Sequence, residues 1–194
     1  MIRFFLAQVR GPLVLILAAT SMLYGVFILQ VLPLWSEMQA ANGGRELQEM
    51  LFYTSGQAGA ALSAYDAHVR RSAMSFYALD AVNAILFAVS IAALIAFALR
   101  RMHAPHSIAR YAIWLPVLSG FFDLIENALL ASALNFNPAS PGFLGAAAGI
   151  ATAIKLTTGM AAIAIMLILL ISAAALHAYR QLNPITPDAR QGPS

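Results

Sequence analysis

The sequence predicts an all-α integral membrane protein, a bundle of four transmembrane helices with a small extracytoplasmic helical cap between spans 1 and 2. Composition is the first observation behind this fold class. Of the 194 residues, 61% are hydrophobic and only 10% are charged, against about 45–50% and 25% in soluble domains. The second observation is four apolar runs that each reach the length of about 20 helical residues needed to cross a ~30 Å hydrocarbon core.

The predicted spans fill most of the chain. The first lacks the short apolar core and the small-residue cleavage pattern of a secretory signal peptide, so we expect it to remain as an anchor. The last is longer than a bilayer is thick, so we expect it to tilt or to project from the membrane. The spans cover about residues 13–34, 76–99, 112–134 and 143–176 of a single membrane domain, 1–180, and a disordered tail is expected at 181–194.

Arginine positions predict the orientation. Seven arginines lie in the N-terminal segment, the second connection and the C-terminal tail, whereas the first connection holds three and the third holds none. Cytoplasmic segments of membrane proteins carry an excess of basic residues. We therefore expect a multi-pass protein of the cell membrane with its N- and C-termini in the cytoplasm. The seven are Arg3, Arg10, Arg100, Arg101, Arg110, Arg180 and Arg190, and the three are Arg45, Arg70 and Arg71.

The first connection, residues 35–75, is the only long segment outside the spans. Asn42-Gly43-Gly44 indicates a turn. The segment Arg45–Tyr53 has the apolar spacing of a short amphipathic helix.

Farther along this connection, Thr54 and Gln57 fit a capping box, and the alanine-rich stretch after them is expected to continue without a break into the second span. The sequence thus predicts a helical cap over residues 45–75. The cap either lies on the outer membrane surface or forms a lid over a site that opens outward.

Several classes of chemistry are excluded or disfavoured. The chain has no cysteine, which excludes disulfides and thiolate metal sites. Its four histidines are scattered over different loops, so we expect no metal site and no cofactor. The basic residues form no run that could follow a phosphate backbone, so we expect no nucleic-acid partner.

Four ionisable residues inside the spans are the most informative. Each would cost roughly 2.5–3.5 kcal/mol at the centre of a lipid-facing helix. Counting 1.5 Å per residue from the expected membrane entry points brings all four to one layer, between the midplane and the outer surface. They are Asp80 in the second span, Asp123 and Glu126 in the third, and Lys155 in the fourth.

The spacing of polar residues predicts that these charges meet inside the bundle. Asp123, Glu126 and Asn127 share one face of a helix, and Asn83 follows Asp80 by three residues. With all four charges ionised the group carries −2, so we expect mutual repulsion to keep one carboxyl protonated near neutral pH. Such a group suits a proton donor, a proton relay or a cation site.

We assign hypothetical roles to these residues. Asp123 and Glu126 would be proton-active or cation-binding groups, with Lys155 as counter-ion or electrophile, and these three are the candidate catalytic residues. The candidate substrate-binding residues are Asp80, Asn83 and Asn127. The other interpretation of the same residues is structural, with Lys155 pairing to a carboxylate to hold the helices in register.

Two further motifs concern helix packing. Pro116 lies inside the predicted third span, where a proline kinks a helix, and the kink either is harmless or opens space beside Asp123 with Gly120 allowing close backbone approach. Gly145 and Gly149 form a GxxxG motif, expected to serve packing within the bundle rather than a dimer interface.

The segment Phe122-Asp123-Leu124-Ile125-Glu126-Asn127, with Ile154-Lys155 in the next span, resembles a group of uncharacterised four-helix bacterial membrane proteins. Members carry an Asp-x-x-Glu-Asn segment in the third span and a lysine in the fourth. Arg70-Arg71 and Leu79-Asp80 match the arginine-rich entry and Leu-Asp pair of their second span. The resemblance covers about residues 54–159. It implies that these polar positions belong together, and it implies no activity.

The leading functional hypothesis is a polar pocket between spans 2, 3 and 4 that binds or processes a lipid-like molecule by acid–base chemistry, or handles a proton or cation. The rival is a non-catalytic membrane subunit or assembly factor whose intramembrane charges are structural. Membrane lipid is the expected partner, and the sequence leaves open whether the protein is an enzyme and whether it forms a homo-oligomer.

Overall fold

The computed structural model describes residues 11–104 and 108–183, and all regular secondary structure in these ranges is helical. Four helical segments are long and apolar enough to cross a membrane, which confirms this part of the predicted fold class. They are Gly11–Val31, Ala67–Arg101, Ile108–Phe136 and Gly142–Leu182.

The first of these segments consists of α2 (Gly11–Val26) and a π-helical turn (Phe27–Val31), and the second is the uninterrupted helix α5 (Ala67–Arg101). The third begins as a 3-10 helix (Ile108–Ile113) and becomes α-helical as α6 (Trp114–Phe136).

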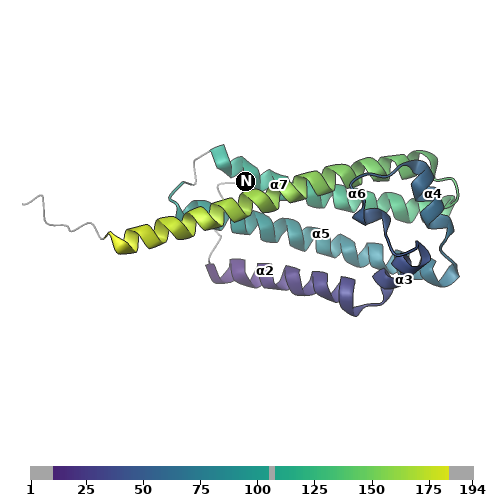
Figure 1. The fold of residues 1–194 in the computed structure, drawn as a ribbon, viewed down its shortest axis with the longest axis horizontal. Helices are drawn as coiled ribbons and strands as arrows, with labels where there is room; N and C mark the ends of the chain where they lie inside the picture. Colours follow the sequence, from purple (N-terminus) through teal and green to yellow (C-terminus); the bar gives the residue numbers. More distant parts are fainter. Residues whose placement is uncertain (1–10, 105–107, 184–194) are drawn as a thin grey trace, which may run out of the picture.

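The fourth is α7 (Gly142–Leu182), whose 41 residues span about 60 Å at 1.5 Å per residue. Its C-terminal part extends beyond the ends of the other helices (Figure 1).

Helix α5 lies at the centre of the arrangement. It packs against α2 on one side and against both α6 and α7 on the other, while α6 and α7 also lie along each other (Figure 1). The Ser90 hydroxyl of α5 donates to the Leu17 carbonyl of α2 at 2.9 Å, and the Tyr24 hydroxyl of α2 donates to the Leu79 carbonyl at 3.1 Å. These bonds add fixed polar contacts to an otherwise apolar interface.

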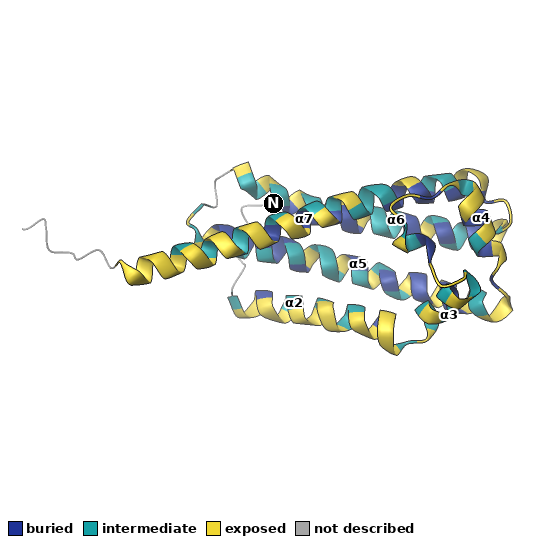
Figure 2. Cartoon of the chain, in the orientation of Figure 1, coloured by how far each residue is buried: buried dark blue, intermediate teal, exposed yellow. Residues whose placement is uncertain are grey.

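The outer faces of α2 and α7 are apolar and largely exposed (Figure 2). Leu15 is 69% exposed and Met22 is 73% exposed on α2, and Ile168 and Ile171 are similarly open on α7. Soluble monomers rarely expose contiguous apolar surface of this kind. A hydrocarbon solvent explains the burial pattern, because side chains facing lipid need no protein cover.

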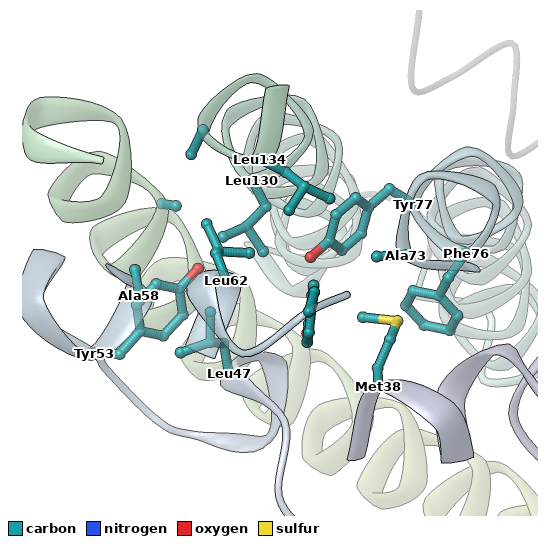
Figure 3. Packing of buried hydrophobic residues seen from close by; sticks show 13 residues of the cluster. Met38, Leu47, Tyr53, Ala58, Leu62, Ala73, Phe76, Tyr77, Leu130 and Leu134 are labelled. Atoms are coloured by element: carbon teal, nitrogen blue, oxygen red, sulfur yellow. The ribbon is translucent and has the colours of Figure 1, made fainter. Parts of the chain in front are cut away.

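Residues 34–66 form a folded unit, which we call the end segment, at the end of the helices opposite the projecting part of α7 (Figure 1). It contains α3 (Leu34–Ala41), a 3-10 turn (Leu47–Glu49) and α4 (Ser55–Ser63). Its apolar side chains, including Tyr53 and Leu62, pack with Phe76 of α5 and Leu130 of α6 in one buried cluster (Figure 3).

Two local predictions for the end segment are confirmed. Asn42-Gly43-Gly44 forms the turn after α3, with Gly43 and Gly44 at φ of 70° and 96°, the left-handed region that favours glycine. Thr54 and Gln57 form the expected capping box at the start of α4.

The prediction of an amphipathic helix over Arg45–Tyr53 is wrong. Only Leu47–Glu49 are helical, as one 3-10 turn. Glu46 and Glu49 close a capping box around this turn, in which each carboxylate accepts from a backbone N–H. This local bonding competes with a longer helix.

The prediction of a continuous helix from Thr54 into the second span is also wrong, because residues 64–66 are not helical and separate α4 from α5. The Asp66 side chain accepts from the backbone N–H groups of His68 and Val69 at 2.8 Å and so begins α5 at Ala67. Residues 67–75, expected in the cap, therefore belong to α5.

Pro116 lies near the start of α6 and not in its interior. Pro116 is the third residue of α6, and the first-turn N–H groups of an α-helix have no partner within it, so proline removes no bond there. At the C-terminal end, α7 continues to Leu182, two residues into the expected tail. The remaining predictions for the tail, and those for Arg3, Arg10, His106 and Arg190, fall outside the described residues.

Gly145 and Gly149 are buried within the chain, which confirms packing inside the protein for the GxxxG motif. Their neighbours belong to the end segment and to the start of α7 itself rather than to another span. A Cβ atom added at Gly149 would lie 1.9 Å from the Tyr53 carbonyl oxygen. The absence of a side chain at this position is therefore what lets the end segment rest on α7.

We expect Gly149→Ala to destabilise the protein by about 1–3 kcal/mol, because backbone would have to move to admit the methyl group. Thermal unfolding in detergent measures the effect as a lower midpoint. Gly56→Ala is the matched control, since its Cβ would find only the Thr54 hydroxyl at 3.9 Å, and its midpoint should stay equal or rise. Equal midpoints for Gly149→Ala and wild type would contradict the packing described.

Glu46 is a second testable feature of the end segment. Its carboxylate is 2% exposed and accepts from the Tyr65 hydroxyl at 2.9 Å and from the Asn42 amide at 2.7 Å. Burial raises the pKa of Glu46 above its ordinary value, and these hydrogen bonds offset the rise only in part.

The raised pKa predicts a loss of stability as pH increases. In the unfolded chain the carboxyl titrates near its ordinary pKa of about 4.3, whereas the folded protein keeps this proton up to a higher pH. The stabilisation that the protonated carboxyl contributes is therefore lost as the pH rises from the unfolded-state pKa through the folded-state pKa. Between pH 4.5 and 8 the unfolding midpoint of the wild type should therefore fall relative to that of Glu46→Gln. A constant difference across this range would show that Glu46 does not titrate differently on folding.

Candidate functional site

Three of the four ionisable residues predicted to meet, Asp123, Glu126 and Lys155, are in contact, and Asp80 is linked to α6 through the Asn127 amide. We call Asp80, Asp123, Glu126 and Lys155 the charge cluster. Helix α6 contributes Asp123 and Glu126 from its buried face, α5 contributes Asp80, and α7 contributes Lys155. The three-residue spacing on α6 directs both of its carboxylates toward α7.

One ammonium group serves two carboxylates. Lys155 Nζ lies 3.1 Å from Asp123 Oδ1 and also forms an ion pair with Glu126 Oε2. The side chains of Lys155 and Asp123 are 11% and 16% exposed, so the pair is shielded but not sealed. The predicted contact between the third and fourth spans is confirmed.

Glu126 is the most deeply buried member, with no exposed surface. Its Oε1 atom accepts from the Thr152 hydroxyl at 2.6 Å and from the Tyr53 hydroxyl at 3.3 Å, while Oε2 faces Lys155. Burial, followed by the Glu126 charge, raises the pKa of Tyr53, so its hydroxyl remains a donor at physiological pH. This carboxylate is thus held by one cation and two hydroxyls.

Asp80 is held differently. It is 7% exposed, and its two oxygens accept from amide groups, Asn127 Nδ2 at 3.0 Å and Asn83 Nδ2 at 3.3 Å. Within the described residues no Lys, Arg or His lies within 4 Å of its carboxylate. The Asn127 carbonyl oxygen in turn accepts from Gln48 Nε2 at 2.7 Å, which ties the end segment to Asp80 through one amide.

Small residues let the three helices approach closely around the cluster. A Cβ at Gly120 would lie 2.9 Å from the Ala84 carbonyl oxygen of α5, as predicted for a position of close backbone approach. A Cβ at Gly159 would lie 2.8 Å from Ser119 Oγ, and that hydroxyl donates to the Lys155 carbonyl at 3.0 Å. The backbones of α5, α6 and α7 are therefore near enough for short side chains to join them.

No residue of the charge cluster lines any of three cavities of about 390, 430 and 570 Å³. The 390 Å³ cavity lies beside the cluster, between α5 and α6, with Ala84, Gly120 and Leu124 in its lining. Within residues 11–104 and 108–183, no three His, Asp or Glu side chains are placed to hold a metal ion.

The sequence did not point to Gln48 and Tyr53 as site residues. Both lie in the segment expected to form an amphipathic helix on the membrane surface, and both reach residues of α6 more than 70 positions away in the chain. The only available signal was the polarity of their side chains beside apolar neighbours. Their contacts with α6 depend on the 3-10 turn that begins after Glu46 and on the close approach of the end segment to Gly149.

Comparisons with protein-family models, with curated proteins and with solved structures found no match. The resemblance to four-helix bacterial membrane proteins therefore stays a hypothesis.

The bonds to Glu126 predict unequal effects of two substitutions. Thr152→Val leaves a buried carboxylate without its shorter hydroxyl bond and should cost about 1.5–3 kcal/mol, whereas Tyr53→Phe removes the longer bond and should cost about 1 kcal/mol. Thermal unfolding in detergent compares the two. Thr157→Val is the control from the same helix, because the exposed Thr157 hydroxyl bonds only the Ala153 carbonyl. A loss in Thr157→Val as large as in Thr152→Val would refute the assignment.

Proposed function

We propose that the protein is a multi-pass protein of the cell membrane whose charge cluster binds and releases a proton. In this proposal the four spans form a bundle, both termini face the cytoplasm and the end segment is the extracytoplasmic cap. The arginine distribution supports the orientation, since Arg100, Arg101 and Arg180 lie at the end opposite the end segment.

The observation that carries the proposal is the charge balance of the cluster. Three carboxylates share one ammonium, which leaves −2 when all are ionised, and Asp80 has amide partners alone. Buried charges without counter-ions are costly, and a carboxyl group avoids this cost by taking up a proton. A proton bound among the three carboxylates brings the net charge to −1.

The geometry assigns a part to each residue. Lys155 holds the Asp123 and Glu126 carboxylates together, and Asp123 is the more exposed of the two. A proton taken up at Asp123 would neutralise that carboxylate and leave the Lys155 ammonium paired with Glu126, while Asn83 and Asn127 orient Asp80. We favour a proton over a lipid-like substrate because Glu126 and Asp80 already bond protein groups and no residue of the charge cluster lines any of the three cavities.

Infrared difference spectroscopy of the purified protein tests the proposal. We expect the wild type to show the carbonyl band of a protonated carboxylic acid near neutral pH, and we expect that band to titrate. It should shift or disappear in Asp80→Asn and in Asp123→Asn. Asp66→Asn changes an exposed carboxylate and should leave the band unaltered. Absence of any protonated carboxyl in the wild type between pH 5 and 8 would rule the proposal out.

The structural alternative also has an observation in its favour. Every carboxylate of the cluster has protein partners, and Glu126 is wholly buried between α6, α7 and Tyr53. Such a pair can hold helices in register in a non-catalytic subunit or assembly factor.

A double-mutant cycle separates the alternatives. Removing one member of a buried pair costs about 3–5 kcal/mol, because the other charge stays buried. If Glu126→Gln and Lys155→Met each lose folded yield in detergent and the double variant recovers it, the pair is structural. Normal folding of all three variants with loss of the titrating infrared band supports proton binding.

A further inference from the structure

A groove lies at the end of the helices opposite the end segment, away from the charge cluster. It lies between the last turns of α5 and the C-terminal half of α7 and has a volume of about 570 Å³. Its polar lining is entirely basic, with no carboxylate among the described residues that form it. These residues are Arg100, Arg101, His103, His177 and Arg180.

The groove is amphipathic along its length. On α5, Phe97 lies one turn before Arg101, and on α7, Leu170 and Ala173 lie one to two turns before His177. Because both helices run toward this end, the apolar residues lie nearer the middle of the spans and the basic residues lie nearer the helix ends, which we call the mouth of the groove. The groove therefore joins the apolar zone of the spans to the level where α5 ends.

Contacts at the groove place cationic groups against apolar surface. The Arg101 guanidinium stacks over the Phe97 ring, with 5.1 Å from its carbon to the ring centroid. This stacking orients the charge at the boundary between the two halves of the groove. Arg180 lies on α7, whose residues form the opposite wall of the groove.

His103, which also lines the groove, has an unusual backbone conformation. His103 has a φ of 57°, the left-handed conformation that usually takes glycine at the end of a helix. The bonds from His103 N–H to the Arg100 carbonyl and from Ala104 N–H to the Leu99 carbonyl complete this helix end. A histidine here costs conformational energy that glycine would avoid, and its position brings an imidazole to the groove.

We propose that this groove binds one anionic phospholipid, with the phosphate at the basic mouth and the upper acyl chains against Phe97, Leu170 and Ala173. The chemistry matches both halves. Arginine groups pair with phosphate oxygens, and the apolar residues lie where acyl chains begin. Basic side chains at cytoplasmic ends of spans attract anionic lipid, and the groove gives that attraction a defined place. The inference stands apart from proton binding at the charge cluster.

Native mass spectrometry of the full chain in detergent, titrated with phosphatidylglycerol or with phosphatidylcholine of the same acyl chains, tests the site. We expect the wild type to bind phosphatidylglycerol more tightly. Arg101→Gln/Arg180→Gln should lose roughly thirtyfold in phosphatidylglycerol affinity, at about fivefold per basic residue. Affinity for phosphatidylcholine should change little.

The matched control removes equal charge from the other end. Arg45→Gln/Arg71→Gln should keep the preference for phosphatidylglycerol, since neither residue lines the groove. Ala174 also lines the groove. A second variant, Ala174→Trp, fills the groove without altering charge and should lose phosphatidylglycerol binding. It keeps the site testable should the arginine variant fail to fold.

Three results would overturn the inference. The first is equal binding of the two lipids by the wild type. The second is equal loss in both arginine variants, which would show attraction by overall charge. The third is displacement of phosphatidylglycerol by millimolar inorganic phosphate, which would make the groove a site for a soluble anion.

Discussion

The arrangement of the helices depends on one lysine that serves two carboxylates. In an apolar environment Lys155, Asp123 and Glu126 cannot each find water, so the three must stay together. This requirement sets the rotation of α6 and α7 about their axes. Asp80 extends the same constraint to α5 through Asn127. The register of three helices thus follows from where a few charges can be accommodated.

Close backbone approach makes this accommodation feasible. The side chains of aspartate and glutamate are short. They reach a lysine on another helix only where small residues, such as glycine, alanine and serine, let the two backbones come close together. Gly120 against Ala84 and Gly159 against Ser119 supply that proximity on either side of the cluster. Gly149 brings the end segment near in the same way, which places Tyr53 on Glu126. Apolar packing and electrostatics are consequently inseparable in this part of the molecule.

The residues of the site that lie on the spanning helices were predictable from the sequence, whereas those contributed by the end segment were not. Asp123, Glu126 and Asn127 were predictable because a period of 3.6 residues puts them on one helix face and lipid penalises any other direction. Lys155 and Asp80 followed from the same penalty. Glu46, Gln48 and Tyr53 were not predictable, because an irregular segment carries them and tertiary contacts alone decide their burial. The position of Pro116 near the start of α6 was not predictable, because helix starts are hard to locate from composition.

The length of α7 has a mechanical consequence. About 40 Å of continuous helix separate Lys155 from Leu182. A rigid rod held near one third of its length behaves as a lever. Tilting it by 10° about the lysine would carry its far end through about 7 Å, given the rise of 1.5 Å per residue. A tilt of α7 coupled to a rearrangement of the buried ion pairs would therefore appear at the opposite side of the molecule as a displacement of several ångströms.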